Sequence, residues 1–197
     1  LAENADVTLS TQGAAGAGAI TVSGATNGTA GGGNETLTLN AGTGTVNLAA
    51  VSGAANVADA TGLTDVTVTD AGTTNFNGAI AITGALTQTN AATGATTFGG
   101  TVAVGSATLR GTTFDVQNSL TATGAIAVTN SGLFTKGATG AITAPGGFST
   151  SGAASLANSI TTTNTDATPA IAIATPASAA TTKPWASPDR ASMKLRS

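Results

Sequence analysis

The stretch Thr73–Asn130, TTNFNGAIAITGALTQTNAATGATTFGGTVAVGSATLRGTTFDVQNSLTATGAIAVTN, decides the fold of this chain. Short apolar alternations recur in it, at Ile80–Ile82, Val102–Val104 and Ile126–Val128, and Gly, Asn or Thr brackets each of them. Because successive side chains of a strand point to opposite faces, such an alternation predicts a half-buried β-strand. The stretch is therefore expected to consist of many short strands.

One short unit occurs repeatedly along the chain. Gly-Ala-Ile-x-Ile/Val-Thr is found at Gly78–Thr83 and Gly124–Thr129, with a close relative at Gly18–Ser23 and a shortened form at Gly140–Thr143. An irregular repeat of about 15–23 residues fits these positions and is within the range of solenoid coils. Five phenylalanines recur at similar intervals: Phe76, Phe98, Phe114, Phe134 and Phe148.

Short strands separated by Gly, Asn and Thr are compatible with a β-sandwich, a β-barrel or a parallel β-solenoid. Asn27-Gly28 and Asn77-Gly78 are typical hairpin dipeptides, which keeps the antiparallel alternatives open. The near-identical units favour the solenoid, in which each coil places its strands on those of the previous coil. A narrow core also suits a chain with only 3% aromatic residues. We therefore expect an all-β solenoid with irregular coils of about 15–23 residues.

The repeats are expected to occupy residues 1–163, and residues 164–197 to form a linker or disordered tail. Within that tail, Ile171–Ile173 is the candidate for one further edge strand. Proline removes a donor from a strand ladder. Four prolines interrupt the Ala-, Thr- and Ser-rich tail: Pro169, Pro176, Pro184 and Pro188. Because the repeat has already begun at Val7–Leu9 and no signal peptide is visible, the chain is expected to be an internal piece of a longer protein.

Composition excludes several classes of function. Charged residues make up 8% of the chain, against about 25% in typical globular proteins. With six Lys and Arg and a net charge of -3, the chain lacks the basic stripe that nucleic-acid binding requires. Arg110 and Lys136 are isolated within the repeats and are expected to be solvated. The absence of Cys and His excludes disulfides, thiolate metal sites and a His-activated hydrolytic triad.

The acidic residues form one cluster in the sequence, Asp59, Asp65 and Asp70. Glycosidases need two carboxyl groups that face each other across one bond, and no basic residue or His accompanies this cluster. Asp is also common in turns, where it accepts backbone hydrogen bonds, and this interpretation is preferred. We predict no catalytic residue, no cofactor and no metal site, and we expect that the protein is not an enzyme.

Thr-x-Thr pairs are the candidate binding surface. Side chains two positions apart on a strand share one face, so stacked pairs would form a regular array of hydroxyl and methyl groups. Such arrays are typical of ice-binding solenoids, although the high β-propensity of Thr also explains a Thr-rich solvated face. Thr36 and Thr38 form one such pair. The candidate binding residues are Thr67, Thr69, Thr87, Thr89, Thr121 and Thr123.

Three segments resemble the degenerate repeats of filamentous haemagglutinin-like adhesins and autotransporter passenger domains: Glu35–Gly44 (ETLTLNAGTG), Asn75–Asn90 (NFNGAIAITGALTQTN) and Thr96–Val102 (TTFGGTV). The resemblance extends over residues 7–163 and includes no catalytic or receptor-binding motif. It implies a right-handed parallel β-helix, secreted and displayed as a stalk on the bacterial surface. The chain shows neither the secretion domain nor the membrane barrel of those families, and its tail departs from their pattern.

The expected function is that of a structural or adhesive segment of a large secreted bacterial exoprotein. Its partners would be host-cell, matrix or bacterial surface components, glycans among them, with no nucleic acid and no membrane span. The alternative is an ice- or glycan-binding solenoid that uses its Thr-rich faces, and a carbohydrate-active enzyme ranks third.

Overall fold

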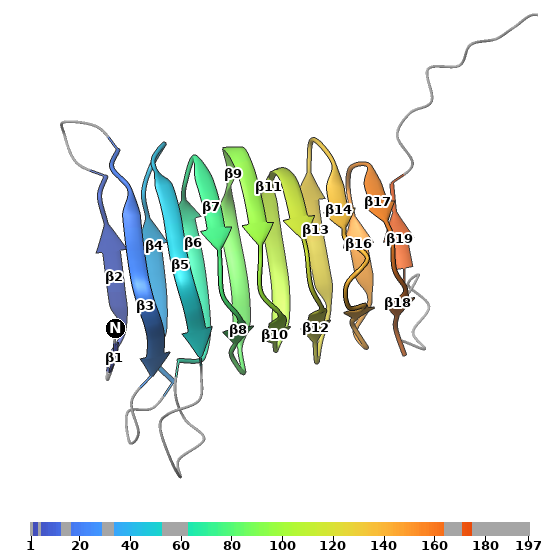
Figure 1. Ribbon diagram of the computed structural model, residues 1–197, viewed down its shortest axis with the longest axis horizontal. Helices are drawn as coiled ribbons and strands as arrows, with labels where there is room; N and C mark the ends of the chain where they lie inside the picture. The colour runs from blue at the N-terminus through green and yellow to red at the C-terminus, as the bar shows by residue number, and fades with distance from the viewer. Residues whose placement is uncertain are drawn as a thin grey trace, which may run out of the picture.

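The protein forms a parallel β-solenoid whose strands lie side by side along one axis (Figure 1). The computed structural model describes residues 2–3, 5–12, 17–28, 34–52, 63–163 and 171–174. Within these ranges there is no helix, and every strand pairing is parallel. The predicted solenoid is confirmed, and the hairpin-linked sandwich and barrel are excluded.

Each coil contributes strands to three faces. The first face stacks β2 (Val7–Ser10), β4 (Thr36–Asn40), β6 (Asp65–Asp70), the first parts of β9 (Ala85–Phe98) and β11 (Ser106–Val116), β13 (Ile126–Asn130), β16 (Phe148–Thr150) and β19 (Ile171–Ile173). The second face stacks the first parts of β3 (Ile20–Gly28) and β5 (Thr45–Ser52), β7 (Thr73–Phe76), the ends of β9 and β11, β14 (Phe134–Lys136) and β17 (Ala154–Leu156). The third face stacks β1 (Ala2–Glu3), the ends of β3 and β5, β8 (Ile80–Ala81), β10 (Val102–Val104), β12 (Leu120–Ala122), β15 (Ile142–Thr143) and β18 (Ile160–Thr161).

The register on the first face gives the length of each coil. In the middle of the stack, Val66 pairs with Leu86, and Leu86 pairs with Ala107. The number of residues between the paired positions is the coil length, and in these coils it falls within the expected range of about 15–23 residues. The first two coils are longer than that range, because Val7 pairs with Leu37 and Leu37 pairs with Val66. The long coils include residues 13–16, 29–33 and 53–62, which lie outside the described residues.

The stack continues past the boundary expected at residue 163. Ile171–Ile173 forms β19 and pairs with β16, as the apolar alternation predicts. The rest of the predicted tail, residues 164–170 and 175–197, lies outside the described residues.

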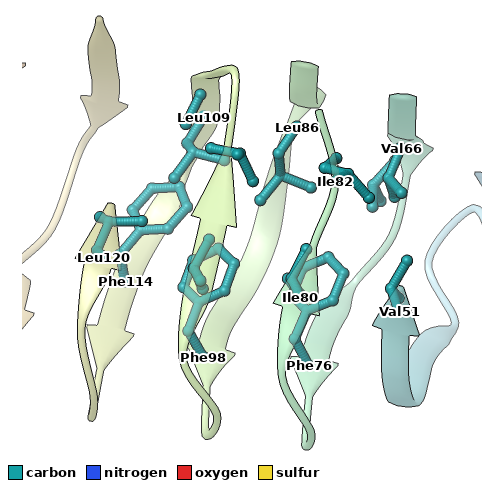
Figure 2. Packing of buried hydrophobic residues seen from close by; sticks show 14 of the residues in the cluster. Val51, Val66, Phe76, Ile80, Ile82, Leu86, Phe98, Leu109, Phe114 and Leu120 are labelled. Carbon is teal, nitrogen blue, oxygen red and sulfur yellow. The ribbon is translucent and has the colours of Figure 1, made fainter. Parts of the chain in front are cut away.

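Inward-facing side chains form continuous files along the axis, seen between the strands in Figure 2. Phe76 and Phe98 pair in register, and their rings stack with centroids 5.1 Å apart and planes inclined by 1°. Both are buried. Burying such a side chain stabilises the fold by about 1.5–3 kcal/mol. Phe114 and Phe134 also pair in register, so four of the five phenylalanines lie over a phenylalanine of a neighbouring coil.

The corners between faces bring backbones into close contact. At the corner between the first and second faces, the Gly72 N–H donates to the Gly44 carbonyl at 2.8 Å. A Cβ added to Gly94, one coil further on, would overlap the carbonyl of Gly72. Only glycine fits at such an approach, which explains why Gly recurs between the short strands.

Candidate functional site

A file of five threonines runs along the outer side of the first face. The register pairs Thr8 with Thr38, Thr38 with Thr67, Thr67 with Thr87, and Thr87 with Thr108. Each is flanked in sequence by inward-facing apolar or amide side chains, so each hydroxyl lies on the solvent side. We call these residues the threonine file. Since neighbouring strands are about 4.7–4.9 Å apart, the file is a regular row of hydroxyl and methyl groups.

The threonine file ends where the next coils substitute other residues. Thr108 is followed in register by Ala127, and Ala127 by Ser149 and then Ala172. The regular row is therefore confined to the first five coils. In the coils beyond it, the same position carries smaller side chains.

Four of the predicted binding residues are brought together on this face. Thr67 and Thr87 belong to the threonine file, and Thr69 and Thr89 lie beside it. The Thr89 hydroxyl donates to the Thr69 carbonyl at 3.0 Å, which confirms that the second pair is adjacent across one coil step. Both Thr69 and Thr89 are exposed. In the following coils, Arg110 pairs with Thr129, so this second row is not composed of threonine throughout.

Neither of the other two predicted residues lies on the first face, and Thr123 lies in the bend that follows β12. Thr121 belongs to β12 on the third face, where it pairs with Ala103 on one side and Thr143 on the other. Thr123 is exposed, and its hydroxyl donates to the Gly105 carbonyl at 3.2 Å. The six candidates therefore form one group of four and one separate pair, not a single array.

Thr8 and Thr108 were not among the predicted residues, because neither belongs to a Thr-x-Thr pair. Each instead stands between two apolar residues, in Val7-Thr-Leu9 and Ala107-Thr-Leu109. An apolar-Thr-apolar triplet marks an outward Thr on a strand whose neighbours face the core. The triplet in the sequence therefore identifies Thr8 and Thr108 as outward-facing residues. Only the register shows that they stack in one file with the other threonines.

A second polar file runs along the outer side of the second face. The Asn75 amide donates to the Asn47 side-chain oxygen at 2.8 Å, and the Asn47 amide lies 3.4 Å from the Thr21 hydroxyl. Further on, the register places Thr97 and Asp115 at the same position. Stacked Asn side chains stabilise neighbouring coils by hydrogen bonds between them. This file supports the stack and leaves few amide groups for a ligand.

Of the three acidic residues singled out by sequence, two lie in β6 and one lies outside the described residues. The Asp65 carboxylate accepts a hydrogen bond from the Ala85 N–H at 2.5 Å, at the start of the strand in the next coil. Asp70 ends the same strand, and Asp59 lies outside the described residues. Asp65 therefore accepts a backbone hydrogen bond, as that interpretation predicts, but it does so at the start of a strand and from the next coil, not within a turn. Within the described part of the chain, no three His, Cys, Asp or Glu residues are grouped so that they could hold a metal ion.

Lys136 is buried, which corrects the expectation that it is solvated. It occupies an inward-facing file between Val116 and Leu156. Its Nζ donates to the carbonyls of Gly137, at 2.9 Å, and Thr139, at 2.6 Å. Desolvation lowers the pKa of Lys136 below its ordinary value, and the charge of Asp115 opposes this shift. Arg110, by contrast, is exposed as expected.

Comparison of the chain with protein-family models, curated proteins and solved structures finds no match. No helix among the described residues could span a membrane.

Proposed function

We propose that this chain is a structural or adhesive segment of a large secreted bacterial cell-surface exoprotein. The observation that carries the proposal is the uninterrupted parallel stack, from β2 to β19 on the first face. Such a stack behaves as a rod whose length grows with each coil. Its role would be to hold a binding surface away from the cell. Host-cell, matrix or bacterial surface components, glycans among them, would be its partners.

Two further observations support the role of presenting a binding surface to a partner. The outer faces carry Thr, Asn and Ser, which offer hydroxyl and amide groups at a regular spacing. The chain also has few charged residues, so its contacts with a partner would depend on hydrogen bonds and apolar contacts more than on salt-sensitive ion pairs.

Surface location and adhesion are tested separately. An antibody against the purified chain is expected to label intact, unpermeabilised cells of the producing organism, and labelling only after permeabilisation would contradict the proposal. Beads coated with the chain are expected to adhere to matrix-coated wells, to cultured host cells or to bacteria. Adhesion to none of these would reject the adhesive role and leave the role of a spacer.

The threonine file favours a second candidate, an ice- or glycan-binding solenoid. A double variant, Thr67→Lys with Thr87→Lys, interrupts the middle of the file with long charged side chains. The matched control, Ala81→Lys with Ala103→Lys, introduces the same side chains at two exposed positions that pair in register on the third face. If this candidate holds, thermal hysteresis or glycan-array binding is lost in the first variant and kept in the control. Wild-type protein that shows neither activity would reject it.

A further inference from the structure

Two Asn-Gly dipeptides occur in the chain, Asn27-Gly28 and Asn77-Gly78. Asn is thermally labile in proteins, because the backbone nitrogen of the next residue can attack the carbonyl carbon of its side chain, Cγ. A following Gly has no Cβ to hinder this attack, and a following Ser hinders it less than a bulkier residue does. In the described part of the chain, the Asn residues followed by Gly or Ser are Asn27, Asn77, Asn118, Asn130 and Asn158.

Four of these five Asn residues are held in place. Asn27 lies inside β3, where it pairs with Ala2 on one side and with Ser52 on the other. The side-chain amides of the three others donate to backbone carbonyls: Asn118 to Gly99 at 2.6 Å, Asn130 to Gly132 at 2.7 Å and Asn158 to Ala138 at 2.8 Å. An amide held in this way is not free to turn its Cγ toward the next backbone nitrogen, so these contacts oppose the attack.

Asn77 is the exception. It lies at the corner between β7 and β8 and is exposed, and its side chain makes no hydrogen bond within the described residues. Among the same residues, neither the Asn77 carbonyl nor the Gly78 N–H has a hydrogen-bond partner. The flanking Phe76 and Ile80 are buried (Figure 2). The fold therefore anchors the chain on both sides of the dipeptide and leaves the reactive pair unrestrained.

We propose that Asn77-Gly78 is a site of spontaneous covalent modification, at which Asn77 becomes aspartate or isoaspartate. The Gly78 backbone nitrogen loses its proton and attacks Cγ of Asn77. The N–Cγ bond forms, the Cγ–Nδ2 bond breaks and ammonia leaves, which gives a cyclic succinimide. Water then opens the ring: cleavage of the new N–Cγ bond gives aspartate, and cleavage of the original peptide bond gives isoaspartate, in which the main chain runs through Cβ and Cγ. The inference does not depend on the proposed surface location or adhesion.

The isoaspartate product does not fit this corner. A Cβ added to Gly78 would overlap the carbonyl of Ala49, and a Cβ added to Gly100, one coil further on, would overlap the carbonyl carbon of Gly78. The backbones of three coils are therefore already in contact here. Isoaspartate adds one carbon to the main chain at this point, and a packed region accommodates additional atoms only with strain. Aspartate adds a negative charge on an exposed side chain and leaves the main chain unchanged.

Peptide mapping by mass spectrometry tests the selectivity of the site. The full chain is incubated at mildly alkaline pH, which promotes loss of the amide proton, once folded and once in urea. In the folded protein, Asn77 is expected to convert several-fold faster than Asn27 and than the three Asn-Ser sites. In urea, the two Asn-Gly sites should convert at similar rates. Equal rates at Asn77 and Asn27 in the folded protein, or conversion of Asn77 only in urea, would overturn the proposal.

Urea unfolding tests the effect of the modification on the stack. Aged wild-type protein that carries isoaspartate, detected with an isoaspartate-specific methyltransferase, is expected to unfold at a lower urea concentration than fresh protein. Asn77→Gln blocks the succinimide route, because the longer side chain would have to close a larger ring, so its unfolding midpoint should not change on ageing. Asn27→Gln is the matched control and should lose stability on ageing as the wild type does.

Asn77→Asp separates the added charge from the lengthened main chain. The fresh variant carries the charge without the extra carbon, so it should be as stable as fresh wild type. Isoaspartate-containing protein that unfolds at the same urea concentration as Asn77→Asp would show that the corner accommodates the longer chain, and the proposed weakening of the stack would be wrong.

Discussion

Lys136 shows how a single residue can be charged in sequence and internal in the fold. Its position in the repeat is one that Phe98 and Val116 occupy in the two preceding coils, so the chain path directs its side chain inward. Two backbone carbonyls compensate for part of the lost hydration. Glu35 presents the opposite case, since it is buried and neither carboxylate oxygen has a hydrogen-bond partner among the residues that the structure describes.

The lowered pKa of Lys136 predicts a pH-dependent stability. Well below the lowered folded pKa, both states hold the proton. Between that pKa and the ordinary value of 10.5, the unfolded chain binds more protons than the folded chain, so the free energy of unfolding contributed by this group rises with pH. The difference in unfolding free energy between wild type and Lys136→Met should therefore shift in favour of the wild type as the pH approaches 10.5. Urea unfolding over a series of rising pH values measures this, and a pH-independent difference would contradict it.

Glu35→Met is expected to stabilise the protein. Leaving a buried polar group without a partner costs about 1–3 kcal/mol, and Met removes that cost at similar side-chain length. Glu35→Gln is the control, and it should gain less because the amide is still a buried polar group. Thermal or urea unfolding gives the comparison. A loss of stability in both variants would indicate that the carboxylate has a partner in solution, such as a bound cation.

At the scale of the element, strands and corners contribute differently to the stack. β9 and β11 each run through a corner and pair with neighbours on two faces, so each connects those faces within one strand. Their registers shift between Leu109 and Thr113, where the two faces meet. The corners themselves depend on small residues, because the backbones of adjacent coils nearly touch there.

Two Gly→Ala substitutions distinguish the cost of a steric clash at a corner from the general effect of replacing glycine in a strand. Gly94→Ala places a methyl group against the carbonyl of Gly72 and is expected to lower the free energy of unfolding by about 1–3 kcal/mol. Gly24→Ala is the matched control, because no atom lies within 4 Å of its added Cβ. It should change stability by no more than about 1 kcal/mol. Equal effects at the two positions would show that the corner can relax.

At the scale of the whole molecule, each coil contacts only its neighbours, so stability is a sum of coil and interface terms. Coils in the middle have two neighbours, and the outermost described coils have one. The chain is therefore expected to open from its ends before it unfolds globally.

Hydrogen exchange tests this expectation. Amides of β9 and β11, in the middle of the stack, should be the most protected, and protection should decline toward β2 and toward β19. Exchange measured peptide by peptide with mass spectrometry resolves the gradient. Uniform protection from β2 to β19 would mean that the described coils unfold as a single unit.

The sequence by itself determined the class of fold and its inner composition. Period-two alternation, as in Ile126–Val128, specifies which side chains of a short strand face the core, because strand geometry alone decides this. Repetition of near-identical units favoured stacking over hairpins. The same local signal identified Ile171–Ile173 as a strand despite its surroundings.

Only the tertiary structure decided which residues become neighbours on the surface. The coil that joins Val7 to its partner Leu37 is much longer than the coil that joins Ala107 to Ile126, so no fixed period predicts the register. For that reason the sequence does not predict that Thr67 and Thr87 lie in one file while Thr121 lies on another face, or that Lys136 is buried. Periodicity is a property of each strand, whereas the register between coils depends on how many residues each corner contains.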